Sequence, residues 1–348
     1  MSIETYMAEQ GKVLAETFRR QDVAAFLKHL ALSAGHDGEA YDRILLVGSG
    51  SSLNALSIVR PWLQAAVGQP VEVINPAVFL QVVDDVFGTP LVVILSQSGT
   101  SSTSIEGARR ASRKGWCSVV ITADPDSPIA TVGLPMILLP IGEEPIGPKT
   151  KGFTASIAAC FMLAAGLAGK QIGRLSVAEI EAVLEASKNA ASSLLGSNAL
   201  PSYIVVTGSG RHYGVALEAS LKIAEIAGVA TAAFEPEELL HGRLHGTDRN
   251  SLVIMIASDE EGRDLAAHTA AVMSDRDVKV VLLNLTATPT PFDWLQIDAR
   301  AANPLDTILA SIPFQYLAVQ CARERHMVPE AMTYPGLSKA LAIKTLSR

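Results

Sequence analysis

The sequence is poor in cysteine and in aromatic residues. Only three of its 348 residues are cysteines (Cys117, Cys160 and Cys321), and aromatic residues make up 5%. An odd number of widely separated cysteines excludes a disulfide framework, and the lack of a CxxC pair argues against structural zinc. We therefore expect a reduced, cytoplasmic protein whose core is built mainly from Ala, Val, Leu and Ile.

Long hydrophobic runs and an excess of positive charge are also missing. The most apolar window, residues 157–168, is shorter than the ~18–20 residues that a membrane span needs, and the first residues do not resemble a signal peptide. The chain has 28 Lys and Arg against 35 Asp and Glu, a net charge of −7. This balance argues against general binding to nucleic acid or to a membrane surface, because both need a basic face. A small phosphate is still allowed, since backbone N–H groups at a helix start can hold one.

The chain contains an internal repeat. ILLVGSG at residues 44–50 has a counterpart in IVVTGSG at residues 204–210, an offset of 204 − 44 = 160. The later apolar runs of the first half also have counterparts in the second half. The pairs are 71–76 with 231–236, 91–95 with 252–256, 118–121 with 279–282, and 135–139 with 294–297. Continuous β-branched runs separated by helix-length segments are typical of parallel strands buried on both faces. The sequence therefore predicts an α/β protein with two tandem, doubly wound, five-stranded parallel sheets related by duplication.

The predicted organisation has four parts. They are an N-terminal helix (1–35), a first domain (36–170), a linking helix (171–195) and a second domain (196–348). Ser176 followed by Glu179 predicts a capping box at the start of the linking helix.

Two serine-rich loops follow predicted strands of the first half. GSGSSLN at 48–54 follows the first strand, and SQSGTSSTS at 96–104 follows the third. In such sheets ligands bind at the carboxyl ends of the strands, so we expect these loops to form a phosphate site. The alternatives are a plain strand–helix turn for the first loop and a low-complexity linker for the second. GSGSSL lacks the third glycine of a dinucleotide fingerprint, which disfavours a nucleotide-binding Rossmann protein.

The second half contains candidate catalytic groups in place of the serines. Glu218, Lys222 and Glu225 recur at helical spacing, which puts neighbouring members within reach of one another. The alternative is an exposed, salt-bridged helix face. His241 and His245 are four residues apart, but Gly242 and the lack of an HExxH pattern argue against a metal site.

These motifs resemble the double SIS-domain (sugar isomerase) family of phosphosugar isomerases, deaminases and deglycases, and the isomerase half of glucosamine-6-phosphate synthase. The matching segments are SQSG at 96–99, TKGFT at 150–154, ALEASLKIAEI at 216–226, ELLHG at 238–242 and LSK at 337–339. The resemblance extends over nearly the whole chain from about residue 40 and implies a flavodoxin-like fold in each half.

The resemblance also implies roles for individual residues. The sugar 6-phosphate would be held by Ser52, Ser96, Gln97, Ser98 and Ser101, in a loop shaped by Gly50 and Ser51. Glu225 would be the general base, beside Lys222, and Lys339 would engage the open-chain sugar. His241 would assist ring opening from the neighbouring subunit, which implies a homodimer with shared active sites.

The sequence departs from the synthase pattern at several positions. Thr100 stands where the synthase has an acidic residue, and Pro148 and Lys149 stand where it has small residues. Lys149 either contacts an anionic substituent of the substrate or is a surface lysine. Arg243 stands in place of a proline, and we expect no glutamine-driven amination, because no glutaminase domain precedes residue 40.

The predicted function is isomerisation, deamination or deglycation of a ketosamine or aminosugar 6-phosphate. Aldose–ketose chemistry needs a carboxylate to move one proton between adjacent carbons and a group that can open the ring. Side chains supply both, so we expect no metal and no other cofactor. The alternative is a phosphosugar sensor without turnover, for which the serine loops alone would suffice.

Overall fold

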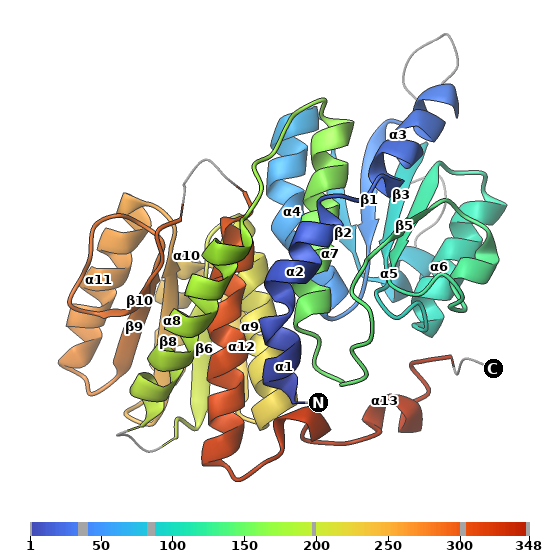
Figure 1. Cartoon of the computed structure of the whole chain (residues 1–348). Helices are drawn as coiled ribbons and strands as arrows, with labels where there is room; N and C mark the ends of the chain where they lie inside the picture. Colours follow the sequence, from blue (N-terminus) through green and yellow to red (C-terminus); the bar gives the residue numbers. More distant parts are fainter. Residues whose placement is uncertain (1, 34–40, 82–87, 197–199, 300–303, 346–348) are drawn as a thin grey trace. The chain divides into compact units, whose positions relative to one another are not determined.

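The structure is a computed structural model, and it describes residues 2–33, 41–81, 88–196, 200–299 and 304–345 (Figure 1). The chain divides into two compact units. One, which we call the β1–β5 unit, comprises Lys12–Glu144, Lys151–Arg174 and Gly336–Arg348. The other, the β6–β10 unit, comprises Met1–Gly11, Pro145–Thr150 and Leu175–Pro335.

The β1–β5 unit contains a five-stranded parallel sheet in the order β2-β1-β3-β4-β5. Its strands are β1 (Arg43–Val47), β2 (Val71–Ile74), β3 (Pro90–Leu95), β4 (Ser118–Thr122) and β5 (Met136–Leu138). All six residues of the central strand β3, PLVVIL, are buried, as a strand covered on both faces requires.

Helices cover this sheet and complete its core. They are α3 (Asp22–Ser33), α4 (Ser51–Val67), α5 (Pro76–Gln81), α6 (Ser102–Arg113) and α7 (Lys151–Leu167), with α2 (Gln10–Thr17) leading into the unit. Helix α4 packs against α7, and α5 packs against α6. The helix α7 is buried on almost every side, which accounts for the apolar window around residues 157–168.

The β6–β10 unit repeats this arrangement. Its sheet has the order β10-β9-β8-β6-β7, with β6 (Tyr203–Thr207), β7 (Ala230–Phe234), β8 (Ser251–Ala257), β9 (Lys279–Asn284) and β10 (Asp293–Gln296). The unit's helices are α1 (Ile3–Ala8), α8 (Val177–Leu195), α9 (Arg211–Ala227), α10 (Pro236–Leu240), α11 (Glu260–Ser274) and α12 (Asp306–Glu324). Helix α12 packs against α8 and α9. The predicted fold of two duplicated, doubly wound parallel sheets is confirmed.

The predicted capping box is confirmed at the start of α8. Ser176 Oγ accepts a hydrogen bond from the Glu179 N–H at 3.2 Å, and Glu179 Oε2 accepts one from the Ser176 N–H at 2.8 Å. Two backbone donors that the helix itself cannot satisfy are thereby paired.

The ends of the chain differ from the predicted organisation. The leading segment, expected as one helix, forms three, α1, α2 and α3. The C-terminal segment with α13 (Leu337–Ala340) groups with the β1–β5 unit, although the prediction placed it in the second domain. Within the described ranges, no helix combines the length and the apolar character that crossing a membrane would require.

Candidate functional site

The two serine-rich loops follow adjacent strands at the carboxyl edge of the first sheet. Strands β1 and β3 are neighbours, and the chain order reverses between them. In a parallel sheet this reversal leaves a crevice outside the carboxyl ends of the two strands. The structure therefore brings residues 48–52 and 96–101 to the same edge, as the sequence predicts.

The first loop leads directly into a long helix. Gly50, with φ of +57°, is the residue before α4, and Ser51 and Ser52 begin that helix. The backbone N–H groups of a helix's first turn have no partners within the helix, and they form a partially positive end that suits phosphate.

The second loop is held in a tight conformation. Gly99 has φ of +63°, and a Cβ atom there would lie 2.1 Å from Ser127 Oγ, so only glycine fits. Ser98 Oγ is 2.8 Å from Thr100 Oγ1, and Ser104 Oγ is 3.1 Å from Ser101 Oγ. Ser96 is buried at the end of β3. The loop hydroxyls are thus ordered by one another before any ligand binds.

Glu144 is a candidate site residue that the sequence reasoning did not identify. The residue is 6% exposed, and its carboxylate accepts hydrogen bonds from Gly152 N at 3.1 Å and from Gln97 Nε2 at 3.5 Å. The contact with Gly152 places the carboxylate at the positive, N-terminal end of α7. The Gln97 side chain passes so close to Gly152 that a Cβ atom there would lie 2.1 Å from Gln97 Nε2. Glu144 and the start of α7 therefore set the orientation of Gln97.

The C-terminal segment pairs with the second serine loop. Thr345 N donates to Thr100 O at 2.7 Å, and Ser102 N donates to Ile343 O at 3.3 Å. Ser101 and Lys344 form an antiparallel bridge between these hydrogen bonds. Lys339 is exposed on the four-residue helix α13, a few residues before this pairing. The β1–β5 unit thus contains both the predicted phosphate residues and one predicted catalytic lysine.

The β6–β10 unit contains a buried cluster of three charges on α9. Lys222 Nζ lies 2.7 Å from Glu225 Oε2 and 3.2 Å from Glu218 Oε1. The side chains of Lys222 and Glu218 are 3% and 4% exposed, whereas that of Glu225 is 26% exposed. The alternative of an exposed, salt-bridged helix face is therefore wrong for Lys222 and Glu218.

The two carboxylates keep Lys222 charged. Burial alone would lower the pKa of this ammonium, but the attraction of Glu218 and Glu225, with their hydrogen bonds, outweighs it and raises the pKa. A permanently charged Lys222 holds one oxygen of Glu225 in place. Among the described residues, none donates a hydrogen bond to the other oxygen, Oε1.

A later loop fixes the backbone of the candidate base. Thr333 N donates to the Glu225 carbonyl at 3.1 Å, and Thr333 Oγ1 lies 3.3 Å from the Ala224 carbonyl. Gly228, which ends α9 with φ of +61°, packs closely against Thr333. These contacts anchor the C-terminal turn of α9, where Glu225 lies.

His241 is highly exposed in the β6–β10 unit. Its side chain is 73% exposed, and its Nε2 lies 3.5 Å from Glu237 Oε1. Gly242 follows with φ of +120°, a conformation that favours glycine. His245 lies three residues after Gly242 in a short 3-10 turn (Arg243–Gly246). The described residues contain no group of three or more His, Cys, Asp or Glu that could hold a metal.

The predicted residues therefore fall into two groups, one in each unit. The serine loops and Lys339 lie in the β1–β5 unit, and Lys222, Glu225 and His241 lie in the β6–β10 unit. Lys149 is half-buried in the short Pro145–Thr150 segment, which groups with the β6–β10 unit.

The second sheet has an ion-pair network where the first has serines. Arg211, the first residue of α9, forms two hydrogen bonds to Asp306, at 3.1 and 2.7 Å, and His212 Nε2 lies 3.5 Å from the same carboxylate. Burial would raise the pKa of Asp306, but the hydrogen bonds from His212 and Arg211 lower it. An internal carboxylate therefore neutralises the basic group at this helix start.

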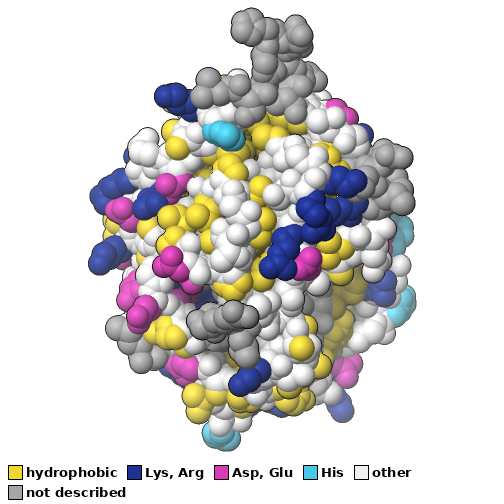
Figure 2. Space-filling model, turned by 90° about the vertical axis from the view of Figure 1, so that its right-hand side faces the viewer, with side chains coloured by type: hydrophobic (Ala, Val, Ile, Leu, Met, Phe, Trp, Pro, Cys, Tyr) yellow, Lys and Arg dark blue, Asp and Glu magenta, His cyan; other side chains and the backbone are white. Residues whose placement is uncertain are grey.

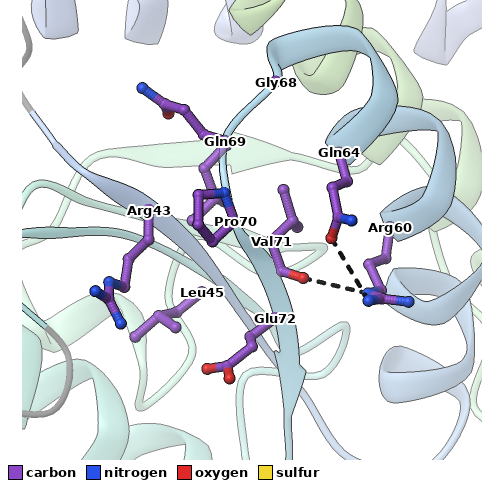
Figure 3. A pocket seen from close by; sticks show the side chains of 10 residues that line it. Arg43, Leu45, Arg60, Gln64, Gly68, Gln69, Pro70, Val71 and Glu72 are labelled. Carbon is purple, nitrogen blue, oxygen red and sulfur yellow. Dashed lines mark hydrogen bonds between the residues drawn. The ribbon is translucent and has the colours of Figure 1, made fainter.

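A cavity of about 560 Å³ lies at the opposite, amino end of the first sheet (Figure 3). It is lined by the starts of β1 and β2 and by Arg60 and Gln64 of α4. Arg60 Nε donates to the Val71 carbonyl at 3.2 Å, and Arg43 pairs with Asp42 at 3.1 Å. Because both arginines are already engaged and Glu72 also lines the cavity, we do not assign it to phosphosugar binding.

Comparison with known proteins identifies the family. The SIS domain model matches residues 40–166 and 201–320, one match on each sheet. The chain therefore belongs to the SIS-domain family, as its motifs predicted.

Three similar proteins illustrate the relationship. The chain is 30% identical, over 301 residues, to glutamine–fructose-6-phosphate aminotransferase (isomerizing) from Acidithiobacillus ferridurans. This match covers 81% of the chain and 49% of that enzyme. A candidate phosphosugar isomerase from Clostridium difficile 630 superposes with a TM-score of 0.81 at 23% identity, over 100% of both chains. Glucosamine-6-phosphate deaminase from Thermotoga maritima superposes with a TM-score of 0.71 at 19% identity, over 94% of this chain and 98% of that one. The chain spans about half the length of the curated relative.

Proposed function

We propose that the chain is a phosphosugar-processing enzyme that isomerises, deaminates or deglycates a ketosamine or aminosugar 6-phosphate. The observation that carries the proposal is the buried Lys222 that holds Glu225 by one oxygen at 2.7 Å and leaves the other to accept a proton. The serine loops at the edge of the first sheet support it, because they supply hydroxyls and helix N–H groups for a phosphate. The names of the relatives, which include an aminotransferase that isomerises a fructose phosphate and a glucosamine-6-phosphate deaminase, agree with this substrate class.

The central step of the proposed chemistry moves one proton between two carbons. Glu225 takes the proton from C1 of an open-chain ketosamine, and the electrons of the C–H bond form the C1–C2 double bond of an enolamine. The C2 carbonyl π bond breaks, and its oxygen takes a proton from water, which later recovers one from the amine N–H. Glu225 returns the proton to C2, which leaves an imine at C1. Water hydrolyses this imine to release ammonia or an amine and the aldose 6-phosphate. Every proton is moved by a side chain or by water, so the reaction needs no metal or redox cofactor.

The remaining residues assist this transfer. His241 opens the sugar ring from the neighbouring subunit of a homodimer, for which its exposure leaves room, and Lys339 engages the open-chain sugar. The phosphate, bound by the serine loops, positions the reacting carbons relative to the base. Lys149 contacts the substituent on the sugar and so contributes to specificity. We propose that this protein works in the cytoplasm.

Proton NMR in D2O tests the proposal directly. The purified full chain is incubated with fructose-, glucose-, glucosamine- and tagatose-6-phosphate and with a fructose–lysine 6-phosphate adduct. We expect one substrate to lose its C1 or C2 proton signal and to be isomerised or to release ammonia or amino acid. Binding without exchange across this panel would favour the alternative, a phosphosugar sensor, for which the β1–β5 loops alone suffice.

A matched pair of variants assigns the base. Glu225→Gln should slow exchange by about 10²–10⁴-fold, as expected when a positioned general base is removed, and should leave phosphosugar binding intact. Glu181→Gln, an exposed glutamate of α8 in the same unit, should keep full activity. Equal activity of the two variants would show that Glu225 is not the general base.

A further inference from the structure

A second candidate binding site lies in the β1–β5 unit, away from the serine loops. A cavity of about 480 Å³ opens between the region of Phe18 and Arg20, the first half of α3, and the C-terminal half of α7. It contacts α7 at Met162, whereas Gln97 and Glu144 contact the same helix at Gly152. Ten residues of helix correspond to roughly 15 Å, so this cavity is distinct from the proposed phosphosugar site.

The floor of the cavity is apolar. Phe18, Val23 and Leu27 line it from the N-terminal segment, and Met162 and Ala165 line it from α7. Ile172 adds an apolar side chain from the segment after the helix. Such a surface favours a ligand with a hydrophobic body, which would displace water from it.

The rim of the cavity is basic. Arg20, Lys170 and Arg174 line it, and its lining residues include no carboxylate. Arg20 pairs with Asp22 at 2.7 Å, so its charge is largely balanced. Lys170 and Arg174 are exposed and form no ion pair with any residue that the structure describes. The negative end of α7 accounts for a cation at position 170 but not for a second one at position 174.

The combination of an apolar floor and a basic rim indicates the kind of ligand that the cavity fits. The chain has a net charge of −7, and Figure 2 shows Lys and Arg side chains beside Asp and Glu on one side of the face and gathered together right of its centre. An apolar cavity with two unbalanced cations is complementary to an anion attached to a hydrophobic group. We propose that this cavity binds a small organic anion: a carboxylate, sulfonate or phosphate monoester that carries an aromatic or aliphatic body. Lys170 and Arg174 bind the anionic group, and the apolar floor packs against the body.

Two related fluorescent probes test the proposal. 8-Anilinonaphthalene-1-sulfonate has the anion and the apolar body, and N-phenyl-1-naphthylamine has the same body without the sulfonate. In titrations of the folded full chain, the sulfonate should bind more tightly than the neutral probe. Its affinity should fall as salt is raised, because exposed charges are screened. Equal affinity for the two probes, without any salt dependence, would overturn the proposal.

Charge reversal at the rim locates the binding. The double variant Lys170→Glu/Arg174→Glu should weaken sulfonate binding by about tenfold, the sum of two exposed charge contacts, and should leave the neutral probe unaffected. Lys188→Glu, an exposed lysine of α8, is the charge-matched control and should bind as the wild type does. If the double Glu variant does not fold, Lys170→Gln/Arg174→Gln replaces it, with a loss of about threefold expected.

The site does not depend on the proposed catalytic function. Glu225→Gln should bind the sulfonate probe normally, and an excess of fructose-6-phosphate should not displace it. Unchanged binding in the rim variants would contradict the proposed site, whatever the outcome for catalysis.

Discussion

At the residue scale, one carboxylate orients part of the predicted phosphate loop. Glu144 holds both Gln97 and the first turn of α7, and nothing in the spacing of the sequence indicates it. Its partners lie 47 and 8 residues away, so the contact depends on how β3, the segment after β5 and α7 meet. A glutamate in a loop between Gly142 and Pro145 carries no local signal of such a role.

We predict that Glu144→Gln weakens substrate binding more than it slows the chemistry. The amide is neutral, so its one oxygen accepts the hydrogen bonds from Gly152 N and Gln97 Nε2 more weakly than the carboxylate oxygen Oε2 does, and Gln97 is held less firmly. We expect KM for the phosphosugar to rise by about fivefold, the value of one hydrogen bond, with kcat nearly unchanged. Steady-state kinetics measure this, and the neighbouring, exposed Glu143→Gln is the control. A fall in kcat at constant KM would show that Glu144 does not act through the phosphate loop.

Asp306 should make the stability of the β6–β10 unit sensitive to acid. Its pKa is lowered in the folded state, so its contribution to stability is present above the unfolded-state value, about 4. That contribution is lost as the pH falls below about 4 through the lower folded-state pKa. Urea unfolding between pH 3 and pH 7 measures it, and Asp306→Asn should flatten this part of the profile.

The same variant should also be destabilised at neutral pH. Removing one partner of a buried ion pair costs about 3 kcal/mol, and rather less here because Arg211 is 27% exposed. Asp275→Asn, an exposed aspartate at the end of α11, should unfold like the wild type. Equal unfolding midpoints for the two variants would show that the Arg211–Asp306 pair contributes nothing to stability.

At the scale of the elements, the repeat made the sheets predictable. Each predicted strand overlaps an observed one, because buried parallel strands are continuous apolar runs that stand out between amphipathic helices. The same reasoning placed the serine loops at the carboxyl ends of β1 and β3. The N-terminal segment was harder to predict, because the breaks between α1, α2 and α3 fall at Glu9 and at residues 18–21, and neither contains a proline or a glycine.

The pairing of the C-terminal segment with the second serine loop could not be predicted from the sequence, for a different reason. The hydrogen bonds between Thr345 and Thr100, and between Ile343 and Ser102, join segments more than 200 residues apart. Backbone hydrogen bonds of this kind do not depend on side-chain identity, so no pattern of residue types in the sequence predicts them. The spacing of the sequence picked out Glu225 but not Lys339; the roles of both come from the family resemblance and stay predictions.

A pair of glycine substitutions tests the conformation of the second serine loop. Gly99→Ala places a Cβ atom 2.1 Å from Ser127 Oγ at φ of +63°, whereas Gly115→Ala has φ of +66° and open space. Both variants incur about 1–2 kcal/mol of backbone strain, but only Gly99→Ala must also move Ser127. We expect Gly99→Ala to unfold at clearly lower urea concentration and to lose phosphosugar affinity. Similar urea midpoints and similar phosphosugar affinities for both variants would show that the loop accommodates the added Cβ atom without losing stability.

At the scale of the whole molecule, the proposed shared site predicts complementation between subunits. Glu225→Gln and His241→Ala should each be inactive as homodimers. If His241 acts on the neighbouring site, mixed dimers contain one site with both Glu225 and His241 intact. Mixing the two variants under conditions of subunit exchange should restore about a quarter of the wild-type activity, since half the dimers are mixed and each has one intact site. No recovery after verified exchange would place His241 in its own subunit's site or outside the mechanism.

The Arg60 contact has a consequence for association between molecules. Strand β2 is at the edge of its sheet. The carbonyl of Pro70 and the backbone groups of Glu72 face β1. The backbone N–H and C=O groups of Val71 and Val73 face outward, away from the sheet. An open edge of this kind is a template to which a strand of another molecule can add. Arg60 Nε already occupies the outward carbonyl of Val71, and its positive charge lies beside it. The arginine therefore occupies one acceptor of this edge and adds a charge beside it, which disfavours pairing with a strand of another molecule.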